Sequence, residues 1–313
     1  MYSVRVRANA AATAAVTLLV MACRQETTRQ SKDTVTFGDS PPTAVVPPVA
    51  ALTGWDERLG SVFAIPAPGG SSALLVFPAF TDASSLDTVR FDMQSSIGGS
   101  LQLLRGGRRV ATARIVEMAH DPVDGCPTWP TVQLASDTGG TLPAEWSLGI
   151  DPGVTVAQMD SLAGLSSKDS TVLTVALARV ASALPGDTAS EFRGRPFVVR
   201  QAAQFRMTGV SLVVAEVTRS VSQEAMPLLE HLFVIARVDS TERSGLRVEY
   251  YERRMGIEDL TETTETLAIV QSPSGVIQLL VARDLGEGVR YSLIERVTGG
   301  EWRIRWTSAY AGC

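Results

Sequence analysis

The stretch EWRIRWT (residues 301–307) decides the fold class of this 313-residue chain. Trp302, Ile304 and Trp306 alternate with the two arginines between them. Because successive side chains of a β-strand point to opposite faces, this alternation predicts a strand that is buried on one face and in water on the other.

The same kind of pattern surrounds this stretch. Leu246, Val248 and Tyr250 alternate with polar or aromatic neighbours, and IQLLVA (residues 277–282) is apolar on both faces, which is typical of a central strand. Gly286-Glu-Gly and Gly299-Gly supply hairpin turns. We therefore expect an antiparallel meander in which sequential strands pair, whether closed into a barrel or folded as a sandwich. Its eight predicted strands are 196–206, 210–219, 230–238, 246–253, 264–271, 275–283, 288–297 and 301–308.

The N-terminal half also carries strand patterns, separated by Gly, Pro or Ser, which favour an antiparallel sheet or sandwich. The predicted strands are 73–77, 88–93, 100–104, 109–116 and 146–150.

A change of period marks the middle of the chain. Ser166 and Asp169 have the spacing of a capping box, and Pro185-Gly186 ends the helical pattern that follows. We expect this helix at 167–184 to pack an apolar stripe onto a sheet, and a shorter helix at about 155–163 to precede it. The apolar positions of the stripe are Val172, Leu173, Ala176, Leu177, Val180, Ala181 and Leu184.

These patterns predict a mainly β (α+β) protein, with an antiparallel β-rich body in two packed halves and one helix between them. The predicted segments are a signal peptide (1–22), a lipidated cysteine and disordered tether (23–50), an N-terminal β-rich half (51–150), a helical segment (151–190) and a C-terminal antiparallel meander (191–313).

Composition excludes several classes of protein. The chain is 45% apolar and 19% charged, which excludes a disordered chain, a collagen-like fibre and a disulfide-dense miniprotein. A formal charge of −5 gives no reason to expect nucleic acid as a partner.

The first 22 residues carry an export signal. Arg5 and Arg7 precede an apolar run, residues 10–22, that has the length of a signal-peptide core and is too short to span a membrane as a helix. The run ends in Val20-Met-Ala-Cys23, which resembles the lipobox of bacterial lipoprotein precursors. The resemblance implies cleavage before Cys23 and lipid attachment there; the alternative is an ordinary signal peptide with Cys23 as a free thiol.

The expected localisation follows from the same resemblance. Arg24 stands where lipoproteins kept at the inner membrane tend to carry Asp, so it favours the outer membrane. Residues 24–50 lack periodicity and contain four prolines near their end, which predicts a tether of roughly 80 Å when extended. We expect an extracytoplasmic body held near the membrane through its lipid.

Two cysteines remain once Cys23 carries lipid. Cys126 lies in a turn-rich loop and Cys313 ends the chain, so the sequence predicts a disulfide between them in an oxidising compartment. Two free thiols or an intermolecular bridge are the alternatives.

Catalytic candidates are few. The chain has no G-x-S-x-G, S-x-x-K, H-E-x-x-H, C-x-x-C or P-loop pattern, and its two histidines cannot form a three-histidine metal site. His120 with Asp121 and Asp124 could bind an ion or support hydrolysis, but Asp-Pro and Asp-Gly are standard turn dipeptides. His231, at the start of an apolar strand, is the other candidate base.

Two further features bear on binding. The run from Glu258 to Glu265 holds four carboxylates, which we interpret as a solvated strand edge that discourages edge pairing rather than as a calcium loop. Trp129 and Trp306 could line a cleft between the halves if the disulfide forms, although tryptophan more often fills a core.

The sequence therefore predicts a lipid-anchored extracytoplasmic protein that binds an unknown ligand or envelope protein, or that has a structural role in the envelope, without a cofactor or metal. Two alternatives stay open: a periplasmic hydrolase or metal-dependent enzyme using His120 or His231, and a lipoprotein subunit of an envelope transport or assembly complex.

Overall fold

The structure is a computed structural model of the full chain. It describes residues 62–67, 71–77, 96–119, 128–186, 190–221, 227–257, 261–272 and 274–312. All of them belong to one compact unit, residues 48–313. The predicted signal peptide, Cys23, the tether, the strand at 88–93 and both cysteines of the predicted disulfide lie outside the described residues.

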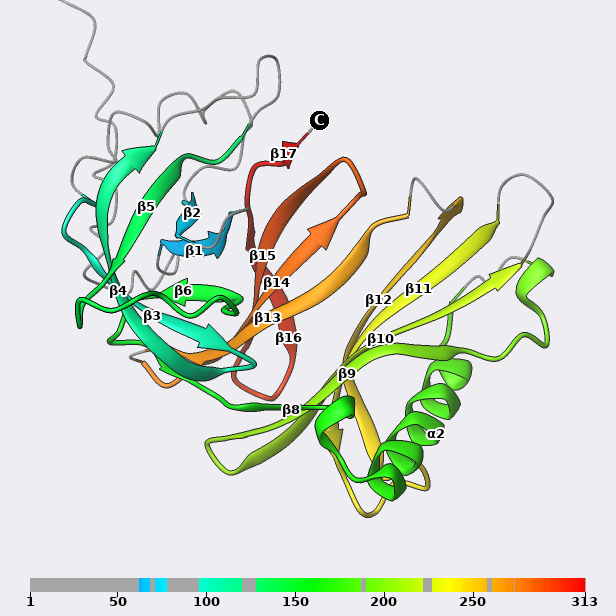
Figure 1. The fold of residues 1–313 in the computed structure, drawn as a ribbon. Coiled ribbons are helices and arrows are strands. Elements are labelled where there is room, and N and C mark those ends of the chain that lie inside the picture. The colour runs from blue at the N-terminus through cyan, green and yellow to red at the C-terminus, as the bar shows by residue number, and fades with distance from the viewer. Residues whose placement is uncertain are drawn as a thin grey trace, which may run out of the picture. The chain divides into compact units, whose positions relative to one another are not determined.

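The N-terminal half forms a closed antiparallel barrel, with strand order β1-β2-β5-β4-β3-β6 (Figure 1). Its strands are β1 (Phe63–Pro66), β2 (Ser72–Val76), β3 (Ser100–Arg105), β4 (Arg108–Ala119), β5 (Thr131–Ser136) and β6 (Leu148–Ile150). The sequence patterns predicted a sheet or sandwich and missed β1 and β5. The barrel closes where β1 pairs with β6, at Ala64 and Gly149.

The C-terminal half forms two antiparallel sheets (Figure 1). The helix-covered sheet has the order β12-β11-β10-β9-β8, and the central sheet has the order β16-β15-β14-β13-β7, with β17 paired to β15. Their bounds are β7 (Thr155–Val156), β8 (Met159–Ser161), β9 (Val198–Met207), β10 (Val210–Val221), β11 (Leu228–Val238), β12 (Leu246–Ile257), β13 (Thr263–Gln271), β14 (Ile277–Asp284), β15 (Gly288–Arg296), β16 (Trp302–Thr307) and β17 (Ala311–Gly312).

Three apolar cores hold these layers together. One joins the barrel interior to one face of the central sheet, and Phe63 of β1 meets Tyr291 of β15 edge to face at 5.2 Å between ring centroids. A second core lies between the two sheets, and a third lies between the helix-covered sheet and helix α2. The central sheet is therefore covered on both faces, by the barrel and by the other sheet.

Helix α2 (Ser167–Ala183) confirms the main helix prediction. Ser166 caps it: its hydroxyl accepts from the Asp169 backbone N–H and donates to the Asp169 carboxylate. Leu177 is buried against the sheet, whereas Val172, which we placed in the same stripe, is 62% exposed. The apolar face is narrower than predicted.

The predicted helix at 155–163 is wrong. Its first residues form β7, which pairs with β13, and β8, which pairs with β9, before a short 3₁₀ turn at Leu162–Gly164. A second 3₁₀ turn covers Ser190–Phe192. Pairing with long neighbouring strands outweighs the local helical pattern here, as tertiary context commonly does.

The eight strands predicted in the last 120 residues are all present, with ends shifted by a few residues. Among these eight strands, consecutive strands pair within each sheet, and the chain changes sheets between β12 and β13. Alternation in EWRIRWT is wrong in detail because a bulge lies between Ile304 and Trp306. Trp302 packs between the sheets, Trp306 packs against the barrel, and Ile304 is exposed.

Candidate functional site

Polar side chains gather at one end of the central sheet, on both of its faces. This end is formed by the start of β13, the end of β14 and the start of β15. The face toward the helix-covered sheet holds a network of ion pairs, and the face toward the barrel borders a cavity. The two faces use the same residue types in different ways.

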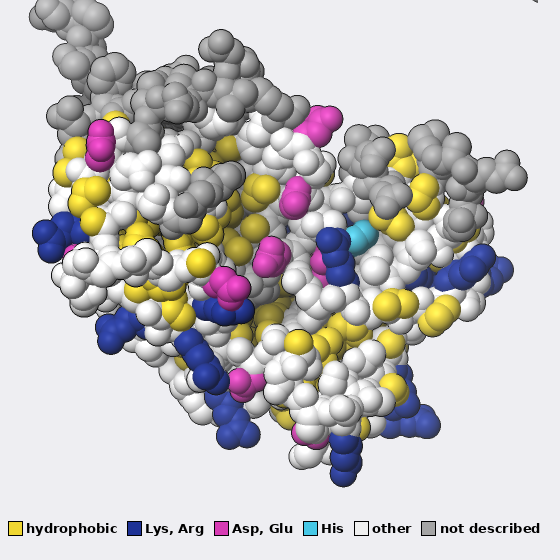
Figure 2. Space-filling view, in the orientation of Figure 1, with side chains coloured by type: hydrophobic (Ala, Val, Ile, Leu, Met, Phe, Trp, Pro, Cys, Tyr) yellow, Lys and Arg dark blue, Asp and Glu magenta, His cyan; other side chains and the backbone are white. Residues whose placement is uncertain are grey.

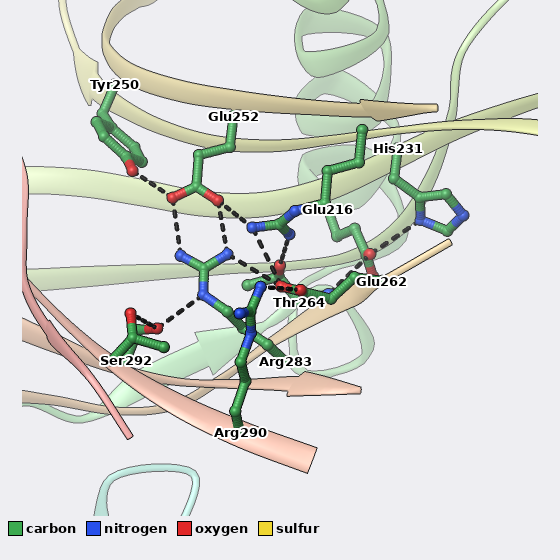
Figure 3. Close-up of polar contacts among 11 residues, drawn as sticks. Glu216, His231, Tyr250, Glu252, Glu262, Thr264, Arg283, Arg290 and Ser292 are labelled. Atoms are coloured by element: carbon green, nitrogen blue, oxygen red, sulfur yellow. Dashed lines mark hydrogen bonds and ion pairs between the residues drawn. The ribbon is translucent and has the colours of Figure 1, made fainter. Parts of the chain in front are cut away.

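Arg283 of β14 is the centre of the ion-pair network (Figure 3). Its guanidinium is 2% exposed and binds both carboxylate oxygens of Glu252, with N–O distances of 2.6 and 2.8 Å. Its Nε donates to the Ser292 hydroxyl at 2.8 Å. Two parallel N–H···O bonds are the strongest arrangement of arginine with a carboxylate. Arg283 therefore fastens β12 of one sheet to β14 of the other.

Glu262 is the second carboxylate of the network. It pairs with Arg254 at 3.2 Å, with Arg283 at 3.4 Å and with Arg290 at 2.5 Å. Burial raises its pKa, and the contact with Arg290 opposes that rise. The run of carboxylates before β13 was interpreted as a solvated edge; that interpretation is wrong for Glu262, which is buried, while Glu258 lies outside the described residues.

Tyr250 completes this side by donating to Glu252. Burial and that hydrogen bond raise the pKa of the Tyr250 phenol. Arg254 contacts Glu252 as well, so each carboxylate of the network faces more than one cation or donor. The network satisfies the rule that a buried charge needs a partner and further hydrogen bonds.

Glu216 and His231 lie next to this network (Figure 3). One Glu216 oxygen is 3.0 Å from the His231 Nδ1 and accepts from the Thr264 backbone N–H at 3.0 Å. Gln201 donates to the Thr264 carbonyl at 2.6 Å. These side chains of the helix-covered sheet therefore bind the backbone edge of β13 at Thr264, where no strand among the described residues pairs with it.

The cavity lies on the barrel-facing side of the central sheet and measures about 260 Å³. Its floor is Ala282, which stands between Glu265 and Tyr291 in the strand register. Asp284 lies one row away, and Ile65 of β1 closes the cavity from the barrel. The small side chain of Ala282 leaves the space that larger neighbours border.

The mouth of the cavity carries charge. Glu265 and Asp284 are exposed at its edge, and Arg200 and Glu216 reach it from the helix-covered sheet. The Arg200 Nε is 3.8 Å from a Glu216 oxygen, and its side chain is 51% exposed. Acidic side chains surround a hollow between the barrel and the sheets in the space-filling view (Figure 2).

Tyr291 stands at the inner side of the cavity. Its side chain is 5% exposed and lines the cavity, yet its hydroxyl has no hydrogen-bond partner among the described residues. Burial raises its pKa to about 12, and the negative charges of Asp284 and Glu265 add to the rise. The phenol therefore stays protonated at neutral pH, beside two carboxylates.

Those two carboxylates lack cationic partners within the described part of the chain. The Asp284 carboxylate accepts a hydrogen bond only from the Gly286 backbone N–H, at 2.6 Å. Gly286 has a φ of +85°, a conformation that favours glycine. Glu265 has no hydrogen bond or ion pair there. The contrast with Glu252 and Glu262, which arginines surround, distinguishes the two faces.

A second cavity of about 200 Å³ borders the first, because Gln201 and Glu216 line both. A wider groove of about 730 Å³ lies at the turns near Thr208, Gly275 and Thr298, where Arg303 and Arg305 approach Glu295. Arg296 also lines this groove, but its carboxylate partner, Glu249, does not.

The predicted site residues divide into two groups. His120, Asp121, Asp124, Cys126 and Cys313 lie outside the described residues. His231 is 5% exposed, and its Nε2 has no partner in the described structure, so no hydroxyl stands within reach of it there as a nucleophile would. Among the described residues, no group of His, Cys, Asp and Glu has an arrangement able to hold a metal ion.

Trp129 and Trp306 are both buried in the core that joins the barrel to the central sheet. Neither lines one of the three cavities described above. They act as core residues, the second of the two interpretations that the sequence left open.

No family model, no curated protein and no solved structure matches this chain. In the described part of the chain, no helix has both the length and the apolar character that crossing a membrane requires.

Sequence reasoning missed Arg200, Glu216, Asp284 and Tyr291. Two signals were present: Glu216 is a lone charge within the apolar run LVVAEV, and Arg283 directly follows the apolar run LLVA of β14. A charge in such a position needs a buried partner, which indicates a polar site without locating it.

Proposed function

We propose that this protein is a lipid-anchored extracytoplasmic binding protein that holds a small ligand in the cavity above Ala282. The lipobox-like end of the signal segment supports the anchor. A partly open cavity with apolar walls and a few convergent polar groups supports ligand binding, since such sites commonly lie between packed subdomains.

The observation that carries the binding function is the Tyr291 hydroxyl. It lines a cavity from a side chain that is 5% exposed, and no described residue bonds it. The Tyr291 hydroxyl keeps some access to solvent, so it is open to a hydrogen bond from water or from a ligand in the cavity. Binding accounts for the described residues better than hydrolysis does, because His231 is packed beside Glu216 without an adjacent nucleophile.

Membrane fractionation tests the anchor. We expect Cys23→Ser to release the protein from the membrane fraction and to remove the mass of the lipid. Ser31→Ala is the control, because it changes a residue outside both the lipobox and the proposed disulfide and should leave the protein in the membrane fraction. Unchanged mass and membrane association of Cys23→Ser would contradict the proposed anchoring.

We also propose the Cys126–Cys313 disulfide as part of the extracytoplasmic state. A bridge across about 187 residues would contribute roughly 5 kcal/mol by restricting the unfolded chain, less any native strain. Non-reducing peptide mapping should recover the two cysteine peptides linked. Recovery of both as free thiols after rapid alkylation would refute the bridge.

A further inference from the structure

We propose that the cavity above Ala282 binds a small organic cation with a protonated amine, held by Glu265, Asp284 and Tyr291. The identity of the ligand class rests on the proposed binding function, and its test is separate from the test of the anchor.

Charge is the first reason. Three carboxylates line this cavity, those of Glu216, Glu265 and Asp284, against one guanidinium, that of Arg200. Glu216 already has partners in His231 and the Thr264 N–H. Glu265 and Asp284 keep free acceptor oxygens, so the field at the mouth attracts a cation.

The pattern of arginine use is the second reason. On the opposite face of the same strands, Arg283 and Arg290 neutralise Glu252 and Glu262. The neighbouring carboxylates on the cavity face receive no such cation from any described residue. A bound cation would supply the charge that the chain itself provides on the other face.

Tyr291 supplies the third reason. Its phenol stays protonated at neutral pH, and its oxygen can accept an N–H hydrogen bond deep in the cavity. Glu265 and Asp284 lie on the same face of the sheet as Tyr291 and close enough for their charges to raise its pKa. An ammonium group placed beside these residues would find carboxylate and phenol oxygens as hydrogen-bond acceptors.

Shape favours an organic cation over a bare ion. The cavity of about 260 Å³ has apolar walls from Ile65, Leu267, Ala282 and Val289. Such walls suit the methylene groups of an alkyl amine, whereas Mg²⁺ keeps several waters and prefers an oxygen-lined octahedral site. We therefore expect a short carbon chain over Ala282 with its charged end at the carboxylates.

Isothermal titration calorimetry on the purified full chain tests the proposal with three matched four-carbon probes. We expect 1,4-diaminobutane to bind, and succinate and 1,4-butanediol not to bind. Binding should weaken as salt is raised, because the mouth of the cavity is exposed and its charges are screened. Magnesium chloride serves as the inorganic comparison.

Charge-removing variants locate the binding. Asp284→Asn and Glu265→Gln should each weaken diamine binding about tenfold, the effect of losing one charged hydrogen bond. Glu301→Gln, the same change at an exposed position in the turn before β16 and not lining the cavity, should leave the affinity unchanged. Ala282→Leu should block binding by filling the floor.

Three results would overturn the proposal: no binding of the diamine, preferred binding of succinate or Mg²⁺, or diamine binding that Asp284→Asn weakens no more than Glu301→Gln does. If succinate binds and Arg200→Gln abolishes that binding, the cavity is a binding site, but its ligand is an anion and not a cation. None of these results alters the outcome expected for Cys23→Ser, so the failure of the ligand class and the failure of the anchor are distinguishable.

Discussion

The two faces of one end of the central sheet differ in how they treat carboxylates. On the face toward the helix-covered sheet, Arg283 binds Glu252 through both oxygens, and Arg290 binds Glu262. On the face toward the barrel, one strand position away, Glu265 and Asp284 lie beside a cavity without a cation from any described residue. Side chains at successive positions of the same strands thus meet opposite conditions.

This difference separates the carboxylates that stabilise the fold from those that are available to a ligand. Glu252 and Glu262 are enclosed between two sheets, where an unpaired charge would be costly, and arginines accompany them. Glu265 and Asp284 are exposed at a cavity mouth, where water solvates them until a ligand arrives. Removing a charge should therefore affect stability on one face and binding on the other.

Arg283→Leu should have the largest effect on stability. It leaves Glu252 and Glu262 buried without their shared cation, which we expect to lower the free energy of unfolding by about 3–5 kcal/mol. Urea unfolding followed by tryptophan fluorescence measures the change. Arg206→Leu is the matched control, because Arg206 is exposed on β9 and forms no ion pair with a described residue, so its loss should cost within about 0.5 kcal/mol. Equal effects of the two variants would remove the distinction between the faces.

Tyr291 should make stability sensitive to alkaline pH. Its pKa is raised from about 10 in the unfolded chain to about 12 in the folded protein. The folded state thus holds the proton more tightly, and the stability it contributes is present below pH 10 and lost as pH rises through 12. The loss should amount to about 2–3 kcal/mol. The free energy of unfolding, measured at pH values between 9 and 12, should depend less on pH in Tyr291→Phe than in the parent protein. An equal pH dependence in the two proteins would contradict the burial of the phenol.

Glu216→Gln should have an intermediate effect. An amide oxygen can still accept from the Thr264 N–H or from His231, but it loses the charge that strengthens both bonds. We expect a loss of about 1–2 kcal/mol in the free energy of unfolding. The comparison variant is Glu265→Gln, which removes a carboxylate without described partners. A larger loss in Glu265→Gln than in Glu216→Gln would show that Glu265 has a structural role.

Asp284→Asn should have the smallest effect on stability. The Asn side-chain oxygen can keep the hydrogen bond from the Gly286 N–H, and the removed charge has no described cation to lose. Its free energy of unfolding should stay within about 0.5 kcal/mol of the parent value in thermal or urea unfolding. A loss above about 2 kcal/mol would mean that Asp284 belongs with the structural carboxylates.

Local patterns predicted the strands of the C-terminal half but not what each strand faces. Bulges explain much of the gap: the register shift near Glu249 puts Tyr250 on the face toward the central sheet, opposite Val248, with which the alternation had grouped it. A single inserted residue reverses the alternation beyond it, and sequence periodicity does not reveal where it occurs. Helix α2 was predictable because its apolar pattern repeats over several turns and because both of its ends carry clear sequence signals.

The cavity could not be predicted because its residues come from distant parts of the chain. Ile65, Arg200, Glu265 and Tyr291 meet only once the barrel and both sheets have packed. None of them belongs to a local motif, and each alone reads as an ordinary strand residue. Sequence could indicate only that the lone charges in apolar strands, such as Glu216, required partners.

A crystal structure of the protein soaked with 1,4-diaminobutane tests the contrast between the two faces most directly. We predict one ammonium nitrogen within about 3.2 Å of carboxylate oxygens of Glu265 and Asp284, with its carbon chain over Ala282. The Arg283–Glu252 pair should be unchanged in the same crystal. Diamine bound at Glu252 or Glu262 with the arginines displaced, or a cavity that stays free of diamine at saturating concentration, would contradict the assignment of the cavity face to a cationic ligand.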